Sequence, residues 1–355
     1  MDDLLQNEWN CAMITGRYAR QTMFEGIGCE GAERIHAARV SIIGMGALGS
    51  VAAAQLARAG VGFLRIVDRD FVELGNLHRQ ALYTEENAGK QLPKAIAACG
   101  RLAAINSEIV IEPVVADFCR ANAEEFVRDV DLILDGTDNF ETRFLLNEIC
   151  RKCGKPWIYG GAIGATGATM NILQDGGPCL RCMMPVLPMP GEYPTCATEG
   201  ILGMASSIVA SAQAVEALKI IVGSPNISRS FLRFDLWDNE VMRLDMVRDP
   251  DCAVCGKGEY ELPPQGLTEG EEEERTIPLC ADGTFQVSPK QRARIDLAAF
   301  AVRLEEIGMV SHNGYLLRFD NEEASFSLFD DGRAIIRDAK DAAKARSIYA
   351  EYIGL

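Results

Sequence analysis

Residues 41–70 read SIIGMGALGSVAAAQLARAGVGFLRIVDRD, and this stretch decides the fold. It predicts a strand, a G-x-G-x-x-G turn at Gly44, Gly46 and Gly49, a helix, and a second strand that ends at Asp68. Such glycines allow a tight turn and close approach of a phosphate, while a carboxylate at the next strand end can accept hydrogen bonds from ribose hydroxyls. The stretch therefore predicts a nucleotide site, but it does not specify which nucleotide.

The same alternation of strands and helices continues to about residue 175. It is typical of an α/β fold, a doubly wound, mostly parallel sheet of the Rossmann-like kind, whose ligands lie beyond the carboxyl ends of the strands. The expected strands cover residues 39–43, 63–67, 108–115, 131–135 and 157–160. The expected helices cover residues 48–59, 93–104, 121–128 and 140–153.

A stretch rich in Gly, Pro and Glu separates this region from the rest of the chain. We expect a first domain over residues 1–257, an acidic linker over 258–278 and a small α+β domain over 279–355. The last domain combines strand patterns in YLLRFD, SFSLFD and AIIRD with two helical patterns. It contains no recognisable catalytic motif, so its role stays open.

Charge and composition argue against several classes of function. A net charge of −16 and a pI near 4.8 would repel nucleic acid. The acidic N-terminus lacks the features of a signal peptide, so we expect a cytoplasmic protein. The apolar stretch 200–223 contains Gln213, Glu216 and Lys219, which are costly in lipid, so it predicts a core helix and no membrane span.

Polar residues gather after the second expected strand and favour ATP. They are Asp68, Asp70, Asn76, Arg79, Gln80 and Lys94. We call the G-x-G-x-x-G turn and the end of the second expected strand the nucleotide cradle. An arginine and a lysine beside this cradle suit a triphosphate, because cations stabilise negative charge during transfer at phosphorus. An NAD-dependent oxidoreductase is the alternative, and only the glycine pattern supports it.

The segment LILDGTDNFETR places two carboxylates at the end of the fourth expected strand. The oxygens of Asp135 and Asp138 could hold Mg²⁺ together with nucleotide phosphates. Asp138 or Asn139 could also cap the helix that follows, and capping does not exclude metal binding.

Two C-x-x-C pairs predict a structural zinc site. The four residues are Cys179 with Cys182 and Cys252 with Cys255, each pair bounded by Pro or Gly. Such pairs suit a tetrahedral Zn²⁺, which here would link two segments that lie far apart in the sequence. We interpret a third pair, Cys150 and Cys153, as packing residues at the end of a helix.

Cys196 stands alone in EYPTCATEGILG, outside any C-x-x-C pair. A loop cysteine of this kind is a candidate nucleophile. A half-buried thiol without a chemical role is the alternative.

Taken together, the motifs resemble the ThiF/MoeB/HesA adenylyltransferases, relatives of the ubiquitin-activating enzymes. The likeness covers about residues 17–256 and rests on RYARQ, GMGALG, DRDFVELGNLHRQ, QLPKA, DGTDN and the two cysteine pairs, in that order. It implies adenylation, with ATP and Mg²⁺, of the C-terminal glycine carboxylate of a small ubiquitin-like sulfur-carrier protein ending in Gly-Gly. Pyrophosphate would be released, and the pathway would be thiamin, molybdenum cofactor or a related biosynthesis.

The resemblance also implies roles for single residues. Asp68 would hold the ribose, the loop from Gly44 to Gly49 would approach the adenosine, and Asp138 would hold Mg²⁺. The phosphates would be contacted by Asn76, Arg79 and Lys94, and we count Asp70, Gln80 and Asn139 among the nucleotide-binding residues. Arg20 of RYARQ matches an arginine finger that enters the neighbouring subunit's site, which implies a symmetric homodimer.

Further expectations concern the carrier chemistry, the source of the sulfur and the alternative of a silent member. Cys196 matches a crossover-loop cysteine that forms a thioester or acyl-disulfide intermediate in some members of the family. No rhodanese-like domain is present, so sulfur would come from a separate protein. A catalytically silent, partner-binding member of the same fold is the remaining interpretation.

Overall fold

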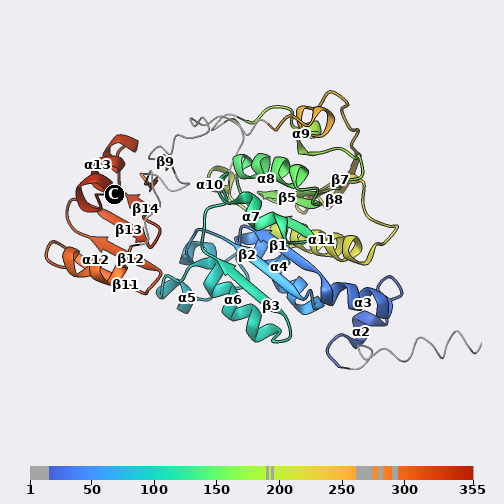
Figure 1. Ribbon diagram of the computed structural model, residues 1–355, viewed down its shortest axis with the longest axis horizontal. Helices are drawn as coiled ribbons and strands as arrows, with labels where there is room; N and C mark the ends of the chain where they lie inside the picture. Colours follow the sequence, from blue (N-terminus) through green and yellow to red (C-terminus); the bar gives the residue numbers. More distant parts are fainter. Residues whose placement is uncertain are drawn as a thin grey trace, which may run out of the picture. The chain divides into compact units, whose positions relative to one another are not determined.

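The computed structural model describes residues 16–188, 192, 196–260, 275–278, 283–289 and 295–354 (Figure 1). The chain divides into two compact units, Met1–Pro263 and Pro264–Leu355. All of the predicted site residues belong to the first unit.

The first unit is built on an eight-stranded sheet with the order β3-β2-β1-β4-β5-β6-β7-β8. The first five strands in this order pair in parallel, and the other three extend the sheet in antiparallel fashion. The strands are β1 Arg39–Ile43, β2 Phe63–Val67, β3 Val110–Val114, β4 Leu132–Asp135, β5 Trp157–Ile163, β6 Thr166–Ile172, β7 Ser230–Asp235 and β8 Glu240–Asp245.

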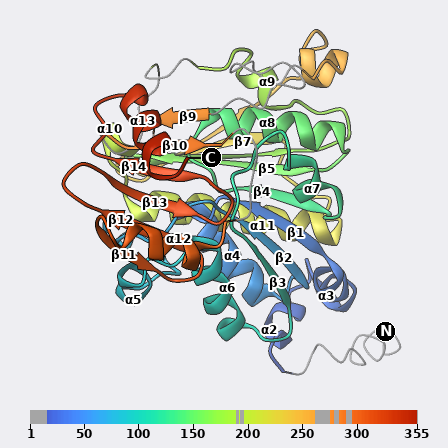
Figure 2. The same ribbon diagram turned by 60° about the vertical axis from the view of Figure 1, so that its left-hand side comes forward.

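Helices cover both faces of this sheet (Figure 2). The helices are α2 Ala19–Thr22, α3 Gly28–Ala37, α4 Ala47–Ala59, α5 Glu85–Gly89, α6 Lys94–Ile105, α7 Ala123–Arg128, α8 Phe140–Lys152, α9 Leu180–Met183, α10 Cys196–Glu199 and α11 Gly203–Val222. The described residues also form two short turns, the 3-10 turn η3 Leu74–Asn76 and the π-helical turn η4 Ala253–Lys257.

The chain changes face between β3 and β4. Helices α3, α4, α6 and α11 pack into one core cluster, and α7 and α8 pack into the other. Strand β4 separates them, because Leu132 and Leu134 join the first cluster while Ile133 joins the second. A switch point therefore lies between β1 and β4, where doubly wound folds bind their ligands. The predicted doubly wound architecture is confirmed.

Helix α11 is long and apolar enough to cross a membrane by length and composition, and among the described residues it alone passes that test. It packs instead on α4, β5 and β6. Its polar side chains have partners in the core, because Gln213 donates to the Asp135 carbonyl at 2.8 Å and Glu216 accepts from Asn171. These contacts are those of a core helix, as residues 200–223 predict.

The sequence pattern did not reveal β6, β7 and β8. A tight turn at Gly164, where φ is +55°, reverses the chain from β5 into β6. Strands β7 and β8 return to this edge only after α11. Such long-range pairing leaves little trace in local periodicity.

In the second unit the described residues form a six-stranded antiparallel sheet, with the order β11-β12-β13-β14-β10-β9, and two helices. Its elements are β9 Arg275–Pro278, β10 Phe285–Ser288, α12 Leu297–Leu304, β11 Met309–His312, β12 Leu316–Asp320, β13 Ser325–Phe329, β14 Ala334–Arg337 and α13 Ala342–Tyr352. The small α+β domain is thus observed, and Asp296 caps α12 by accepting from the Ala298 and Ala299 amides. The sheet begins inside the range expected as a linker, since β9 lies within 258–278.

Candidate nucleotide-binding site and metal centre

In the turn after β1, two of the three glycines pack tightly against neighbouring backbone atoms, and the third does not. A Cβ atom on Gly44 would lie 2.6 Å from the Gly136 carbonyl oxygen, and one on Gly49 would lie 1.9 Å from the Gly44 carbonyl oxygen. Beside Gly46 the nearest atom is the Gln80 Nε2 at 3.9 Å. Packing between β1, α4 and β4 thus requires Gly44 and Gly49, whereas Gly46 leaves room for a ligand.

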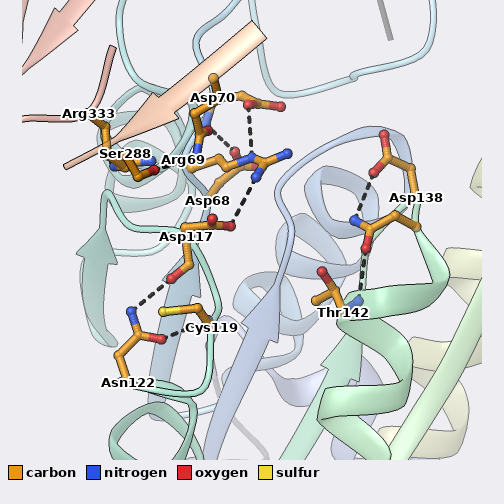
Figure 3. Close-up of polar contacts among 12 residues, drawn as sticks. Asp68, Arg69, Asp70, Asp117, Cys119, Asn122, Asp138, Thr142, Ser288 and Arg333 are labelled. Carbon is orange, nitrogen blue, oxygen red and sulfur yellow. Dashed lines mark hydrogen bonds and ion pairs between the residues drawn. The ribbon is translucent and has the colours of Figure 1, made fainter. Parts of the chain in front are cut away.

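Asp68 follows β2 and is held rigidly at the cradle (Figure 3). Its Oδ2 accepts from the Met45 amide and its Oδ1 from the Asp70 amide, both at 2.6 Å. Burial raises the pKa of Asp68, while the nearby Lys94 ammonium acts in the opposite direction. Each carboxylate oxygen keeps a second lone pair, so Asp68 can also accept hydrogen bonds from ribose hydroxyls.

Lys94 is a buried cation beside this carboxylate. Its Nζ donates to the Asp70 Oδ2 at 3.1 Å, and only 6% of the residue is exposed. Burial disfavours the charge, but the carboxylates of Asp70 and Asp68 outweigh that effect and raise the pKa of Lys94. The first residue of α6 therefore presents a permanent positive charge to the cradle.

The NLHRQ segment places Gln80 beside Gly46 and holds Asn76 and Arg79 against each other. The Arg79 Nη2 donates to the Asn76 Oδ1 at 2.6 Å, which orients the guanidinium. Gln80 is buried, and its Oε1 has no hydrogen-bond partner among the described residues. Helix α11 begins against this segment, since a Cβ on Gly203 would lie 2.8 Å from the His78 carbonyl oxygen.

The DGTDN segment separates a structural aspartate from an available one. Asn139 caps α8 by accepting from the Thr142 amide at 2.9 Å, so Asp138 stays exposed with its carboxylate at the sheet edge. Asp135 is fully buried, and its Oδ2 accepts from the Arg143 Nε at 3.0 Å. Asp138 can therefore hold Mg²⁺, and the interpretation of Asp135 as a second ligand is wrong because its carboxylate is used inside the fold.

Arg69 is a charged residue of this edge that the motif analysis missed. Its Nη1 donates to the Asp117 Oδ1 at 3.1 Å, and its Nε lies 3.6 Å from the Asp70 Oδ1 (Figure 3). The signal was present in DRD, where an arginine stands between two aspartates. Its partner Asp117 lies far away in sequence, after β3.

Arg20 does not meet the other predicted site residues within one chain. It is exposed on α2, where the neighbouring Gln21 Nε2 donates to the Ala59 carbonyl at the end of α4. Helix α4 begins at the glycine turn and has 13 residues, a length of about 20 Å. Arg20 therefore lies at the opposite end of α4 from its own cradle.

Cys196 opens α10, and its side chain lies outside the described part of the structure. The backbone that follows is anchored to the turn between β5 and β6. The Gly164 amide donates to the Gly200 carbonyl at 3.0 Å, and the Leu202 amide donates to the Gly164 carbonyl at 2.8 Å. The role of Cys196 thus stays a prediction.

Four cysteines converge at the face of the sheet that α7 and α8 cover. The Sγ atoms of Cys179, Cys182, Cys252 and Cys255 all lie within 4.8 Å of one another. The sulfurs of Cys179 and Cys252 are 3.7 Å apart, close to the separation of about 3.8 Å that a tetrahedron with 2.3 Å zinc–sulfur bonds requires. The Asn147 Nδ2 lies 3.7 Å from the Cys179 Sγ and supports it from α8.

The third cysteine pair is separate from this cluster. Cys150 lies in the last turns of α8 and is fully buried, and Cys153 is half-buried at the end of that helix. Burial raises the pKa of both thiols. Neither belongs to the four-cysteine group, in agreement with packing roles.

Comparison with known proteins identifies the family of this chain. The model of the ThiF family matches residues 18–254. The chain belongs to the ThiF family. A ThiF relative named sulfur carrier protein ThiS adenylyltransferase, from Bacillus subtilis (strain 168), is 39% identical over 346 residues, which cover 96% of this chain and all of that protein. This relative therefore spans both units.

Further likenesses cover mainly the first unit. The sulfur carrier protein adenylyltransferase of Thermus thermophilus is 38% identical over 246 residues, which are 68% of this chain and 90% of that protein. Among solved structures, E. coli MccB with ATP has a TM-score of 0.60 at 20% identity and covers 72% of this chain and 80% of its own. The MccB likeness is one of fold.

Proposed function

We propose that this ThiF-family chain is an adenylyltransferase acting on a small ubiquitin-like sulfur-carrier protein that ends in Gly-Gly. ATP would be the donor, and pyrophosphate would leave. The observation that supports this proposal is that Asp68 accepts from the Met45 amide in the glycine turn, while Asp68 and Asp138 both lie close enough to the buried Lys94 to raise its pKa. The whole-length relative named ThiS adenylyltransferase supports the same substrate class.

The reaction needs charge neutralisation more than proton transfer. A C-terminal carboxylate is ionised at neutral pH, so it can attack the α-phosphate without a general base. Lys94 and Arg79 would orient the phosphates and offset their charge, and Asp68 would fix the ribose. Asp138 would hold Mg²⁺, which supplies further positive charge at the phosphates.

The remaining parts of the proposal concern assembly and sulfur transfer. Arg20 lies too far from its own cradle, so we propose that it enters the site of a second copy in a symmetric homodimer. The four cysteines would hold a structural Zn²⁺. Cys196 would form the covalent carrier intermediate, and a separate protein would donate the sulfur, in thiamin or molybdenum cofactor biosynthesis in the cytoplasm.

ATP–pyrophosphate exchange tests the activity. We expect exchange that depends on a carrier ending in Gly-Gly, and we expect Asp138→Ala to abolish it while Glu86→Ala, at an exposed pair on α5, has no effect. Absence of carrier-dependent exchange in the native chain would contradict the function. Full exchange in Asp138→Ala would contradict only the role of that residue.

A further inference from the structure

The strand order predicts where each part of ATP lies, if the proposed function is correct. The carboxyl ends run β4, β1, β2, β3 along the sheet edge. Asp138 follows β4, the glycine turn follows β1, and Asp68 follows β2. With phosphates at the glycine turn and ribose at Asp68, the base continues in the same direction and comes to lie over the end of β3.

The loop after β3 is held firmly at this place. The Asn122 Nδ2 donates to the Asp117 carbonyl at 2.8 Å, and the Cys119 amide donates to the Asn122 Oδ1 at 2.9 Å. Phe118, the next residue after Asp117, is buried and packs on Phe126. Asp117 therefore projects from a fixed loop at the position expected for the base.

Arg69 orients the Asp117 side chain and leaves one of its oxygens available. The Arg69 Nη1 donates to the Asp117 Oδ1 at 3.1 Å, while the Asp117 Oδ2 makes no hydrogen bond or ion pair with any described residue. The side chain is 21% exposed, so a ligand can reach it. The guanidinium also offsets the carboxylate charge, which makes an acceptor tolerable near a polyanionic nucleotide.

We propose that Asp117, positioned by Arg69, determines the base specificity of the site. Its Oδ2 accepts a hydrogen bond from the 6-amino group of adenine. A 6-oxo purine presents an acceptor at that position and is disfavoured, because two acceptors then face each other. A polar group of the site that is left without a hydrogen-bond partner discriminates strongly against the nucleotide analogue.

The test compares ATP with inosine triphosphate, which has an oxo group in place of the 6-amino group. Pyrophosphate exchange is measured with both nucleotides. The specificity ratio is kcat/KM for ATP divided by kcat/KM for inosine triphosphate. Arg69 can only donate, so in Asp117→Asn the amide oxygen faces Arg69 and the amide NH₂ takes the place of Oδ2. That NH₂ suits a 6-oxo group, so the ratio should fall by about ten-fold or more.

Arg69→Met tests the positioning role. It should raise KM for ATP several-fold with little change in kcat, whereas the matched exposed arginine variant Arg128→Met should leave both unchanged. If Asp117→Asn does not fold, the double variant Arg69→Met with Asp117→Leu replaces the ion pair by apolar groups. Its ratio should approach one.

The outcomes separate this proposal from the general function. An unchanged ratio in a folded Asp117→Asn or in the double variant overturns the role of Asp117. Native exchange with ATP would then still support the adenylyltransferase. Native exchange that fails with both nucleotides overturns the proposed function and this specificity together.

Discussion

Gly46 and Gly49 stand in one turn, but a methyl group would meet different surroundings at the two positions. At Gly49 it would overlap the Gly44 carbonyl oxygen, whereas at Gly46 its nearest neighbour would be the Gln80 Nε2 at 3.9 Å, an ordinary contact. We expect Gly49→Ala to lower the free energy of unfolding by about 1–3 kcal/mol, because the backbone must shift. Gly46→Ala should leave that energy within about 0.5 kcal/mol and raise KM for ATP.

Urea denaturation and exchange kinetics on both variants check this prediction. Equal losses of stability would contradict the assignment of different tasks to the two glycines. An unchanged KM in Gly46→Ala would show that the ligand does not approach from that side.

Asp129 provides a pH-dependent test far from the cradle. Hydrogen bonds from Arg65 and then Arg39 lower its pKa to about 2, below an unfolded value of about 4. The carboxylate therefore contributes stability above about pH 4, and this contribution is lost as the pH falls through 2. Asp129→Asn should cost about 1 kcal/mol at pH 7, a modest value because the side chain is 50% exposed.

The measurement is the urea midpoint from pH 7 down to pH 3. The difference between native and Asp129→Asn chains should shrink below pH 4. Glu86→Gln, at a fully exposed pair, serves as the control and should change the midpoint little. A difference that grows on acidification would contradict the ion pair.

Some site residues could be predicted from sequence and others could not. Asp68, Lys94 and Asp138 follow strand ends or begin a helix, so local pattern places them. Asp135 stood as a possible Mg²⁺ ligand beside Asp138, because the local pattern does not show that α8 brings Arg143 to its carboxylate. Arg69 was missed because its significance depends on Asp117, which β2–β3 pairing brings near.

At the scale of elements, the cysteine cluster joins α9 to the η4 turn. Between them the chain passes through α11, β7 and β8 before it returns. We expect Cys252→Ser to lose about one Zn²⁺ per chain and to destabilise the first unit, because one thiolate ligand is removed. Cys153→Ser, outside the cluster, should keep the metal.

Metal content by atomic emission and thermal unfolding with and without a chelator check this prediction. Zinc retained in Cys252→Ser would mean that other ligands hold it. A chelator that leaves the unfolding temperature unchanged would show that the ion does not stabilise the fold.

The parallel half of the sheet was predictable because each βαβ step leaves a local signature. Strands β1, β2 and β4 carry buried apolar runs, and β1 and β2 are followed by clear helical patterns. Strand β8 is exposed throughout and carries no such run. Strand β9 falls in a region whose charge and Gly and Pro content suggested a linker. Strand pairing, and not local composition, defines both.

At the scale of the whole molecule, the position of Arg20 makes a prediction about assembly. Arg20→Ala and Asp138→Ala should each be inactive, but one heterodimer site would contain both intact residues. Equal mixing gives about half heterodimers, each with one complete site, so about a quarter of native exchange should return.

This recovery is measured after unfolding and refolding the two variants together. Mixing Arg20→Ala with itself is the control and should recover nothing. No recovery in the mixed sample, with dimers confirmed by light scattering, would contradict action of Arg20 across a subunit interface.

The order of the strand ends has an evolutionary consequence. Asp138, the glycine turn, Asp68 and Asp117 each follow a different strand, and adjacent strands lie about 4.8 Å apart. If Asp117 contacts the base as proposed, changes at the β3 loop would alter which nucleobase is accepted and leave the proposed phosphate-binding residues as they are. A family with this layout can diversify its choice of nucleotide one strand at a time.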